Sequence, residues 1–185
     1  MRNTYLTSHF PLFSILLFSL SFSLYSERQI SGWLKDVGLY AGMLEFFSAG
    51  GIQLTLLFFL VLFFFMIFSA LKLIADTLME LSLLFFSKDV EGIELANLRK
   101  GTWIYLAGSA ASFLFIWMPL GMVCCFLAAT LVYFVFVVYH ISDSLSGAGM
   151  FGLIFFHITF WCAAAAGTSY AGFRLYNSLM KSLPI

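Results

Sequence analysis

Residues 52–86 read IQLTLLFFLVLFFFMIFSALKLIADTLMELSLLFF, and this stretch decides the fold. Its first part, Ile52–Leu71, carries no charge and has the length of a helix that crosses a hydrocarbon core of about 30 Å. Lys72, Asp76 and Glu80 follow with no turn signal between them. We therefore predict one helix whose uncharged part crosses a membrane and whose charged part continues as an amphipathic helix.

Composition places the rest of the chain in a membrane as well. The 185 residues are 62% hydrophobic and 10% charged, whereas soluble domains contain about 25% charged residues. The net charge of zero argues against the basic surface that nucleic-acid binding needs. Cys124, Cys125 and Cys162 lie in apolar segments without zinc-binding spacing, so we interpret them as packing residues. We expect no metal and no cofactor.

The first apolar stretch, residues 7–25, follows a short polar start that contains Arg2. It resembles a signal peptide but lacks an A-x-A cleavage site, which favours an uncleaved span. Residues 26–51 mix charges with aromatic residues and glycines, so we predict short segments on the membrane surface.

The block from Gly101 to Ile141 is too long for one span and is divided by Pro119 and Gly121. We predict a helical hairpin with its turn at residues 119–121; a single kinked span is the alternative. The turn formers at residues 142–149 predict a loop before the last span, and Arg174 and Lys181 follow in a tail.

The predicted fold is therefore all-α, a polytopic transmembrane bundle in a single membrane domain, residues 1–185. About five spans are expected. They cover residues 7–25, 52–71 (continuing as an amphipathic helix to 86), 102–118, 122–139 and 150–171.

Lysine and arginine in short loops indicate the orientation, because such loops stay in the cytoplasm. Lys72, Lys88, Arg99 and Lys100 lie between the second and third spans, whereas the turn near Pro119 has none. The long second helix is thus predicted to reach into the cytoplasm. With five spans, the N-terminus of this cell-membrane protein is cytoplasmic and its C-terminus lies outside.

Lys72, Asp76 and Glu80 are spaced by four residues and share one helical face. One interpretation is the polar edge of a cytoplasmic helix, which docks a protein partner. The other keeps the carboxylates within the bilayer, where they are candidate ion or proton ligands.

His140, Asp143 and His157 are predicted near the same membrane face. The two imidazoles and the carboxylates have a composition compatible with a divalent metal or a proton relay. No H-E-x-x-H motif is present, and a histidine bonded to a backbone carbonyl is the commoner arrangement. The candidate polar cluster comprises Lys72, Asp76, Glu80, His140, Asp143 and His157.

Small residues recur at a spacing of four in two spans: Ala163, Gly167 and Ala171 in the last, Gly108 and Ser112 in the third. This spacing favours close helix packing within the bundle, or contact in a homo-oligomer. Residues 147–152 match G-x-G-x-x-G, but no strand precedes them, so we interpret the match as coincidence and loop flexibility.

No G-x-S-x-G or phosphate-binding loop accompanies these features. The sequence therefore favours a non-enzymatic accessory or interaction subunit that contacts a protein partner through residues 72–86. The alternative is a small ion- or proton-coupled transporter that uses Asp76, Glu80 and His157.

Stretches distributed over nearly the whole chain resemble the YufK-like small membrane proteins of Bacillus-type bacteria. They are NTYLTSHFPL (3–12), FSALKLIADTLMELSLLFFSKDVEG (68–92), ATLVYFVFVVY (129–139), GLIFFH (152–157) and LYNSLMKSLPI (175–185). The resemblance implies a bacterial plasma membrane and a short multi-span protein. It assigns no catalytic or binding residues.

Overall fold

A computed structural model describes residues 9–87 and 99–182. These residues form helices and no β-strand, which confirms the all-α prediction. The chain divides into two compact units, and each is described by itself. The first unit contains residues 1–77 and 91–141; the second contains residues 78–90 and 142–185.

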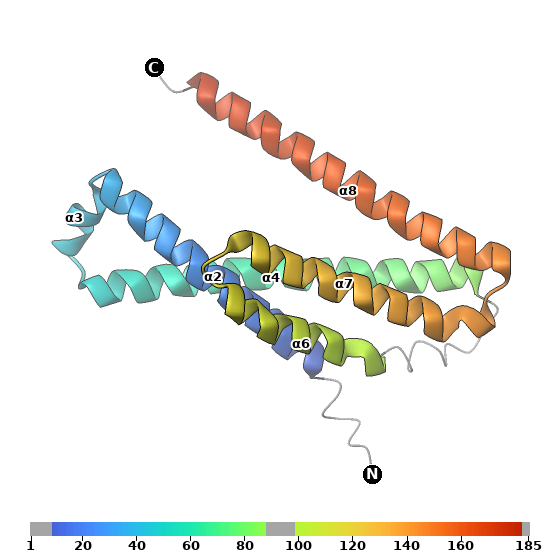
Figure 1. Ribbon diagram of the computed structural model, residues 1–185. Helices are drawn as coiled ribbons and strands as arrows, with labels where there is room; N and C mark the ends of the chain where they lie inside the picture. The colour runs from blue at the N-terminus through green and yellow to red at the C-terminus, as the bar shows by residue number, and fades with distance from the viewer. Residues whose placement is uncertain (1–8, 88–98, 183–185) are drawn as a thin grey trace, which may run out of the picture. The chain divides into compact units, whose positions relative to one another are not determined.

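The helices are labelled in Figure 1. The first unit contains α2 (Phe10–Asp36), α3 (Leu39–Leu44), most of α4 (Ala49–Phe86), η1 (Arg99–Thr102), α6 (Trp103–Ser112), η2 (Phe113–Phe115) and α7 (Pro119–Ile141). The second unit contains the end of α4 from Leu78, η3 (Ser142–Ser144) and α8 (Gly147–Ser182).

Within the described residues, four helices have the length and apolar composition to cross a membrane: α2, α4, α7 and α8. A shorter apolar helical stretch, Trp103–Phe115, precedes α7. The chain is therefore a membrane protein with several candidate transmembrane helices. The proposed start of the first span at residue 7 lies outside the described residues.

The first helix differs from its prediction. The expected surface segments began at residue 26, but α2 continues through Gly32 to Asp36. Glu27 stabilises this extension, because its carboxylate accepts a 2.8 Å hydrogen bond from the Ser31 hydroxyl one turn later. The chain breaks only at Gly38, whose φ of 79° lies in the left-handed region that favours glycine.

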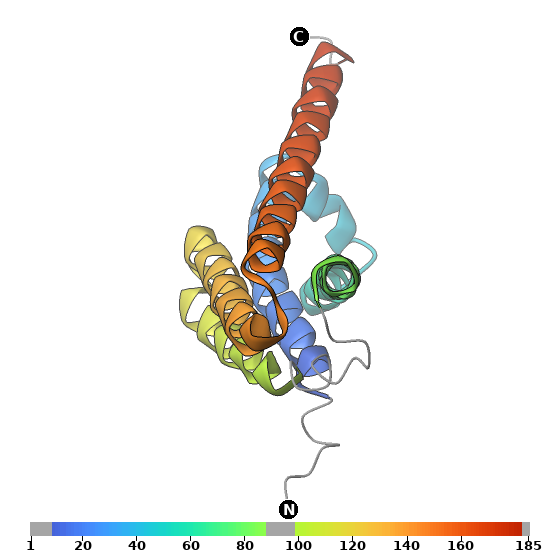
Figure 2. The same cartoon turned by 90° about the vertical axis from the view of Figure 1, so that its right-hand side faces the viewer.

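Residues 102–139 form two helices joined by a turn, and Figure 1 and Figure 2 both show α7 running back alongside α6. That each of the two helices crosses the membrane stays a prediction, since Trp103–Phe115 is shorter than the candidate spans. The predicted turn at residues 119–121 is wrong, because the turn lies at residues 116–118 and Pro119 begins α7. Proline suits the first helical position, since the amide hydrogen that it lacks has no partner there in any helix.

The two hairpin helices approach closely at Gly108. A Cβ atom on this residue would lie 2.7 Å from Cβ of Ala129. A small residue is therefore required on α6 at this level, as the spacing of Gly108 and Ser112 predicted for packing within the bundle.

Phenylalanine rings join three helices of the first unit. Phe18 of α2 lies with its ring centroid 5.6 Å from that of Phe68 of α4 and 5.4 Å from that of Phe126 of α7. Phe22 and Phe64 extend the cluster from α2 and α4. Phe18 and Phe68 are almost fully buried, so this cluster is a core of the unit.

The serines of α2 mostly bond to their own helix. Ser14 donates to the Phe10 carbonyl at 2.8 Å and Ser19 to the Ile15 carbonyl at 2.6 Å, which is the arrangement expected for serine in an apolar helix. Ser21 differs, because its hydroxyl also accepts a 2.8 Å hydrogen bond from Ser112 of α6. Both partners are buried, so a polar contact joins two helices, α2 and α6, inside the unit.

In the second unit, the start of α8 packs on Phe86 at the end of α4. A Cβ atom on Gly149 would lie 2.7 Å from the Phe86 carbonyl oxygen, and one on Gly152 would lie 2.5 Å from the Phe86 ring. These glycines of the G-x-G-x-x-G match therefore allow close packing, and the predicted loop flexibility is wrong. The loop ends before Gly147, and the predicted C-terminal tail is helical to Ser182.

Candidate functional site

The predicted polar face of α4 carries an ion pair. The ammonium of Lys72 donates to the carboxylate of Asp76, one helical turn away. Their side chains are 29% and 51% exposed, respectively. An ion pair this exposed contributes little to stability, about 0–1 kcal/mol, so its main effect is to neutralise two charges on the helix surface.

Two tyrosines of the hairpin are in ring contact. The rings of Tyr105 on α6 and Tyr133 on α7 have centroids 5.2 Å apart. The sequence interpretation missed these residues, although a tyrosine inside an apolar span is itself a signal of a polar contact.

His140 lies in the last turn of α7, in the first unit. Its Nδ1 donates to the Phe136 carbonyl at 3.1 Å, and its ring centroid lies 4.0 Å from that of Phe136. The side chain is exposed. Its described contacts are therefore those of a histidine that is held by its own helix.

The other three candidates belong to the second unit. Glu80 is exposed on α4. His157 is only 5% exposed, and its Nδ1 donates to the Leu153 carbonyl of α8 at 3.1 Å. The side chain of Asp143 lies outside the described part of the structure.

The six candidates are thus divided between the units, with Lys72, Asp76 and His140 in the first. Among the side chains that the structure describes, no three of His, Cys, Asp and Glu are grouped as a metal ion requires. Among these candidates, the contact that the structure shows between two side chains is the ion pair of Lys72 with Asp76.

Apolar side chains surround the polar face of residues 72–86. Leu73 is 69% exposed and Leu84 is 75% exposed, and Phe85 beside it is also exposed. This segment therefore presents an apolar surface with a neutralised ion pair and one additional carboxylate, that of Glu80.

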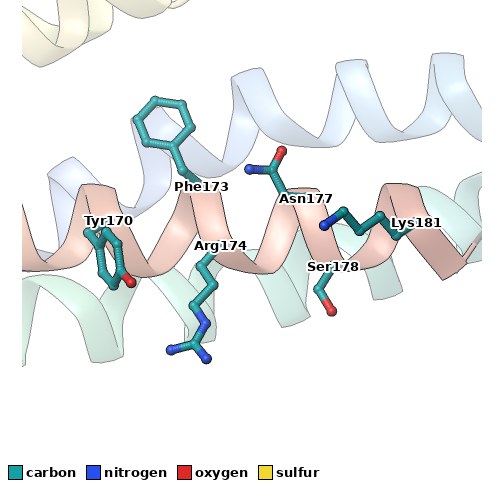
Figure 3. Close-up of a pocket in the computed structure, with 6 residues that line it drawn as sticks. All are labelled: Tyr170, Phe173, Arg174, Asn177, Ser178 and Lys181. Carbon is teal, nitrogen blue, oxygen red and sulfur yellow. The ribbon is translucent and has the colours of Figure 1, made fainter.

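A second polar surface lies near the end of α8. Figure 3 shows the side chains that form it, all of which belong to α8. They are Tyr170, Phe173, Arg174, Asn177, Ser178 and Lys181. The sequence interpretation placed the two cations in an irregular tail, so it missed that they share a helical face.

Comparisons with known proteins agree with the resemblance found in the sequence. The chain is 46% identical over 185 residues to the "Uncharacterized membrane protein YufK" of Bacillus subtilis (strain 168), and the match covers 100% of both chains. A family described as "Family of unknown function (DUF5366)" matches residues 27–184. No solved structure matches the chain. The chain therefore belongs to the DUF5366 family.

Proposed function

We propose that this protein is a non-enzymatic accessory subunit of the cell membrane, which binds another membrane protein through residues 72–86 of α4. The observation that carries this proposal is the length of α4 together with the position of its charges. The 38 residues of α4 form a helix of about 57 Å, nearly twice the thickness of a hydrocarbon core of about 30 Å. Part of the helix therefore extends beyond the lipid or tilts strongly.

The charges indicate which part extends. The residues from Ala49 to Leu71 carry none, whereas Lys72, Asp76 and Glu80 follow within about three turns. This distribution supports a membrane exit near Leu71. The basic residues around the α4–α6 connection, Arg99 and Lys100 among them, support a cytoplasmic location for the extension and for the N-terminus.

The exposed surface of the extension supports a particular partner chemistry. Lys72 neutralises Asp76, which leaves the carboxylate of Glu80 as the charge that sets the electrostatic preference. Leu73, Leu84 and Phe85 supply the apolar area. The matching partner is an amphipathic helix with a leucine-rich face and a lysine or arginine opposite Glu80.

Photocrosslinking in intact cells tests this proposal. A photoreactive amino acid is introduced at Leu84 in the extension and, as a matched control, at Leu54 in the span of the same helix. The two side chains are similarly exposed, at 75% and 70%. We expect a discrete protein adduct from position 84 and lipid adducts from position 54.

A charge-reversing variant, Glu80→Lys, makes the test specific. It is expected to abolish the adduct at position 84 while the protein still accumulates in the membrane, because Glu80 is exposed. Adducts with lipid alone at both positions contradict the proposal. An adduct with a second copy of the chain shows instead that the surface serves a homo-oligomer.

A further inference from the structure

The last turns of α8 have the features of a lipid-headgroup surface. Its 36 residues form a helix of about 54 Å, again longer than a hydrocarbon core of about 30 Å. The apolar residues come first, and all charged residues come last, at Arg174 and Lys181. A span that begins at the start of α8 therefore leaves the segment from about Tyr170 to Ser182 in the interfacial layer or beyond it.

The charge of α8 has one sign. The helix contains two cations and no carboxylate between Gly147 and Ser182. Arg174 and Lys181 lie seven residues apart, which is two helical turns, so they share one face. Asn177 and Ser178 lie between the two cations along the helix and add hydrogen-bond donors near them (Figure 3).

The opposite face is apolar and exposed. It carries Leu175, Tyr176 and Leu179, each more than half exposed. A helix with cations on one side and leucine and aromatic residues on the other is typical of segments that lie in the membrane interface. Tyr170 and Tyr176 are also the residue type that anchors spans at the level of the headgroups.

We propose that the end of α8, residues 170–182, binds the headgroups of anionic phospholipids through Arg174 and Lys181. The phosphate oxygens accept hydrogen bonds from the guanidinium and the ammonium, and the net negative charge of the lipid distinguishes it from a zwitterionic one. The leucine and tyrosine side chains of the opposite face enter the layer below the headgroups. The end of α8 then holds this helix at a defined depth.

The proposal predicts that the protein binds anionic lipid measurably more tightly than zwitterionic lipid. Each cation near an anionic surface contributes about a fivefold preference, so the two together contribute about 30-fold. Native mass spectrometry of the full-length protein in a neutral detergent counts bound lipids during titration. The probes are phosphatidylglycerol and phosphatidylcholine with identical acyl chains. We expect the wild-type protein to bind phosphatidylglycerol about 30-fold more tightly.

Two variants with equal loss of charge separate this site from a general effect of net charge. Arg174→Gln combined with Lys181→Gln is expected to remove most of the preference. Lys35→Gln combined with Lys100→Gln, which removes two cations elsewhere, is expected to keep it. The exchange of Arg174→Lys with Lys181→Arg retains both charges and is expected to keep the preference as well.

Several outcomes overturn the proposal. Equal binding of the two lipids by the wild-type protein does so, as does equal loss of the preference in both charge-removing variants. Competition by millimolar inorganic phosphate shows a site for a free anion instead of a headgroup. All of the substituted side chains in α8 belong to an exposed helical face, and circular dichroism checks that each variant keeps the helical content of the wild type.

Discussion

Substitution of Gly108 tests how closely the hairpin helices α6 and α7 pack. In Gly108→Ala the new Cβ would lie 2.7 Å from Cβ of Ala129, about 1 Å closer than a normal carbon contact. The helices must separate at this level, and such overpacking costs about 1–3 kcal/mol. Alanine also favours the helix over glycine by about 1 kcal/mol, so we expect a net destabilisation of about 0–2 kcal/mol.

Gly167→Ala on α8 isolates the packing term. It makes the same chemical change in a helix, but a Cβ atom there would meet no atom within 4 Å. The unfolding free energy of this control variant is expected to rise by up to about 1 kcal/mol, from helix propensity alone. The difference in unfolding free energy between the two variants therefore measures the packing cost, which we expect to be about 1–3 kcal/mol.

The assay is thermal unfolding of the purified protein in detergent. For a chain of this size, 1 kcal/mol corresponds to about 2–4 °C in the midpoint. The double variant Gly108→Ala with Ala129→Gly removes the opposing methyl group, so the stability lost to overpacking should return. A double-mutant cycle measures this effect as a coupling free energy between the two positions. Equal midpoints for Gly108→Ala and Gly167→Ala would refute the close approach of α6 and α7.

Two further predictions concern polar contacts in the first unit. Ser112→Ala is expected to destabilise the protein by about 0.6–2 kcal/mol, because it removes the hydrogen bond to Ser21 on another helix in addition to the bond to the Ser109 carbonyl. Ser14→Ala removes only a bond within its own helix, and thermal unfolding in detergent compares the two variants. Trp117→Leu removes the ring whose centroid lies 3.9 Å from the Arg28 guanidinium carbon, and this change is expected to lower the stability by about 0.5–1 kcal/mol. Limited proteolysis at the 116–118 turn should then become faster. Unchanged proteolysis in this variant, or equal stability of the two serine variants, contradicts the respective contact.

Local sequence was sufficient for the length and type of the main helices. The apolar run of α4 continues into its charged part without a glycine or proline, so a single helix was predictable and is confirmed. The limits of other elements were less predictable. The charges and glycines after residue 25 suggested an early end to α2, but the side-chain bond between Glu27 and Ser31 and the contact of Arg28 with Trp117 support the helix beyond that point.

In the candidate site, too, some contacts follow from local sequence and others depend on how the helices pack. The pairing of Lys72 with Asp76 follows from a spacing of four on one helix, and that spacing is a property of the sequence alone. The ring contact of Tyr105 with Tyr133 depends on how α6 and α7 pack, and no local pattern encodes that. Whether the two histidines and the carboxylates act together stays a prediction.

The sequence by itself therefore determined that this is an all-α membrane protein, because hydropathy and helix length are properties of continuous segments. Only the tertiary structure decided which faces of these helices meet. Ser21 and Ser112 are 91 residues apart and bond directly, and Gly108 and Gly149 leave space for partners that lie far away in the chain. In spans with nearly uniform hydropathy, the packing face is set by the shape and hydrogen bonding of distant residues.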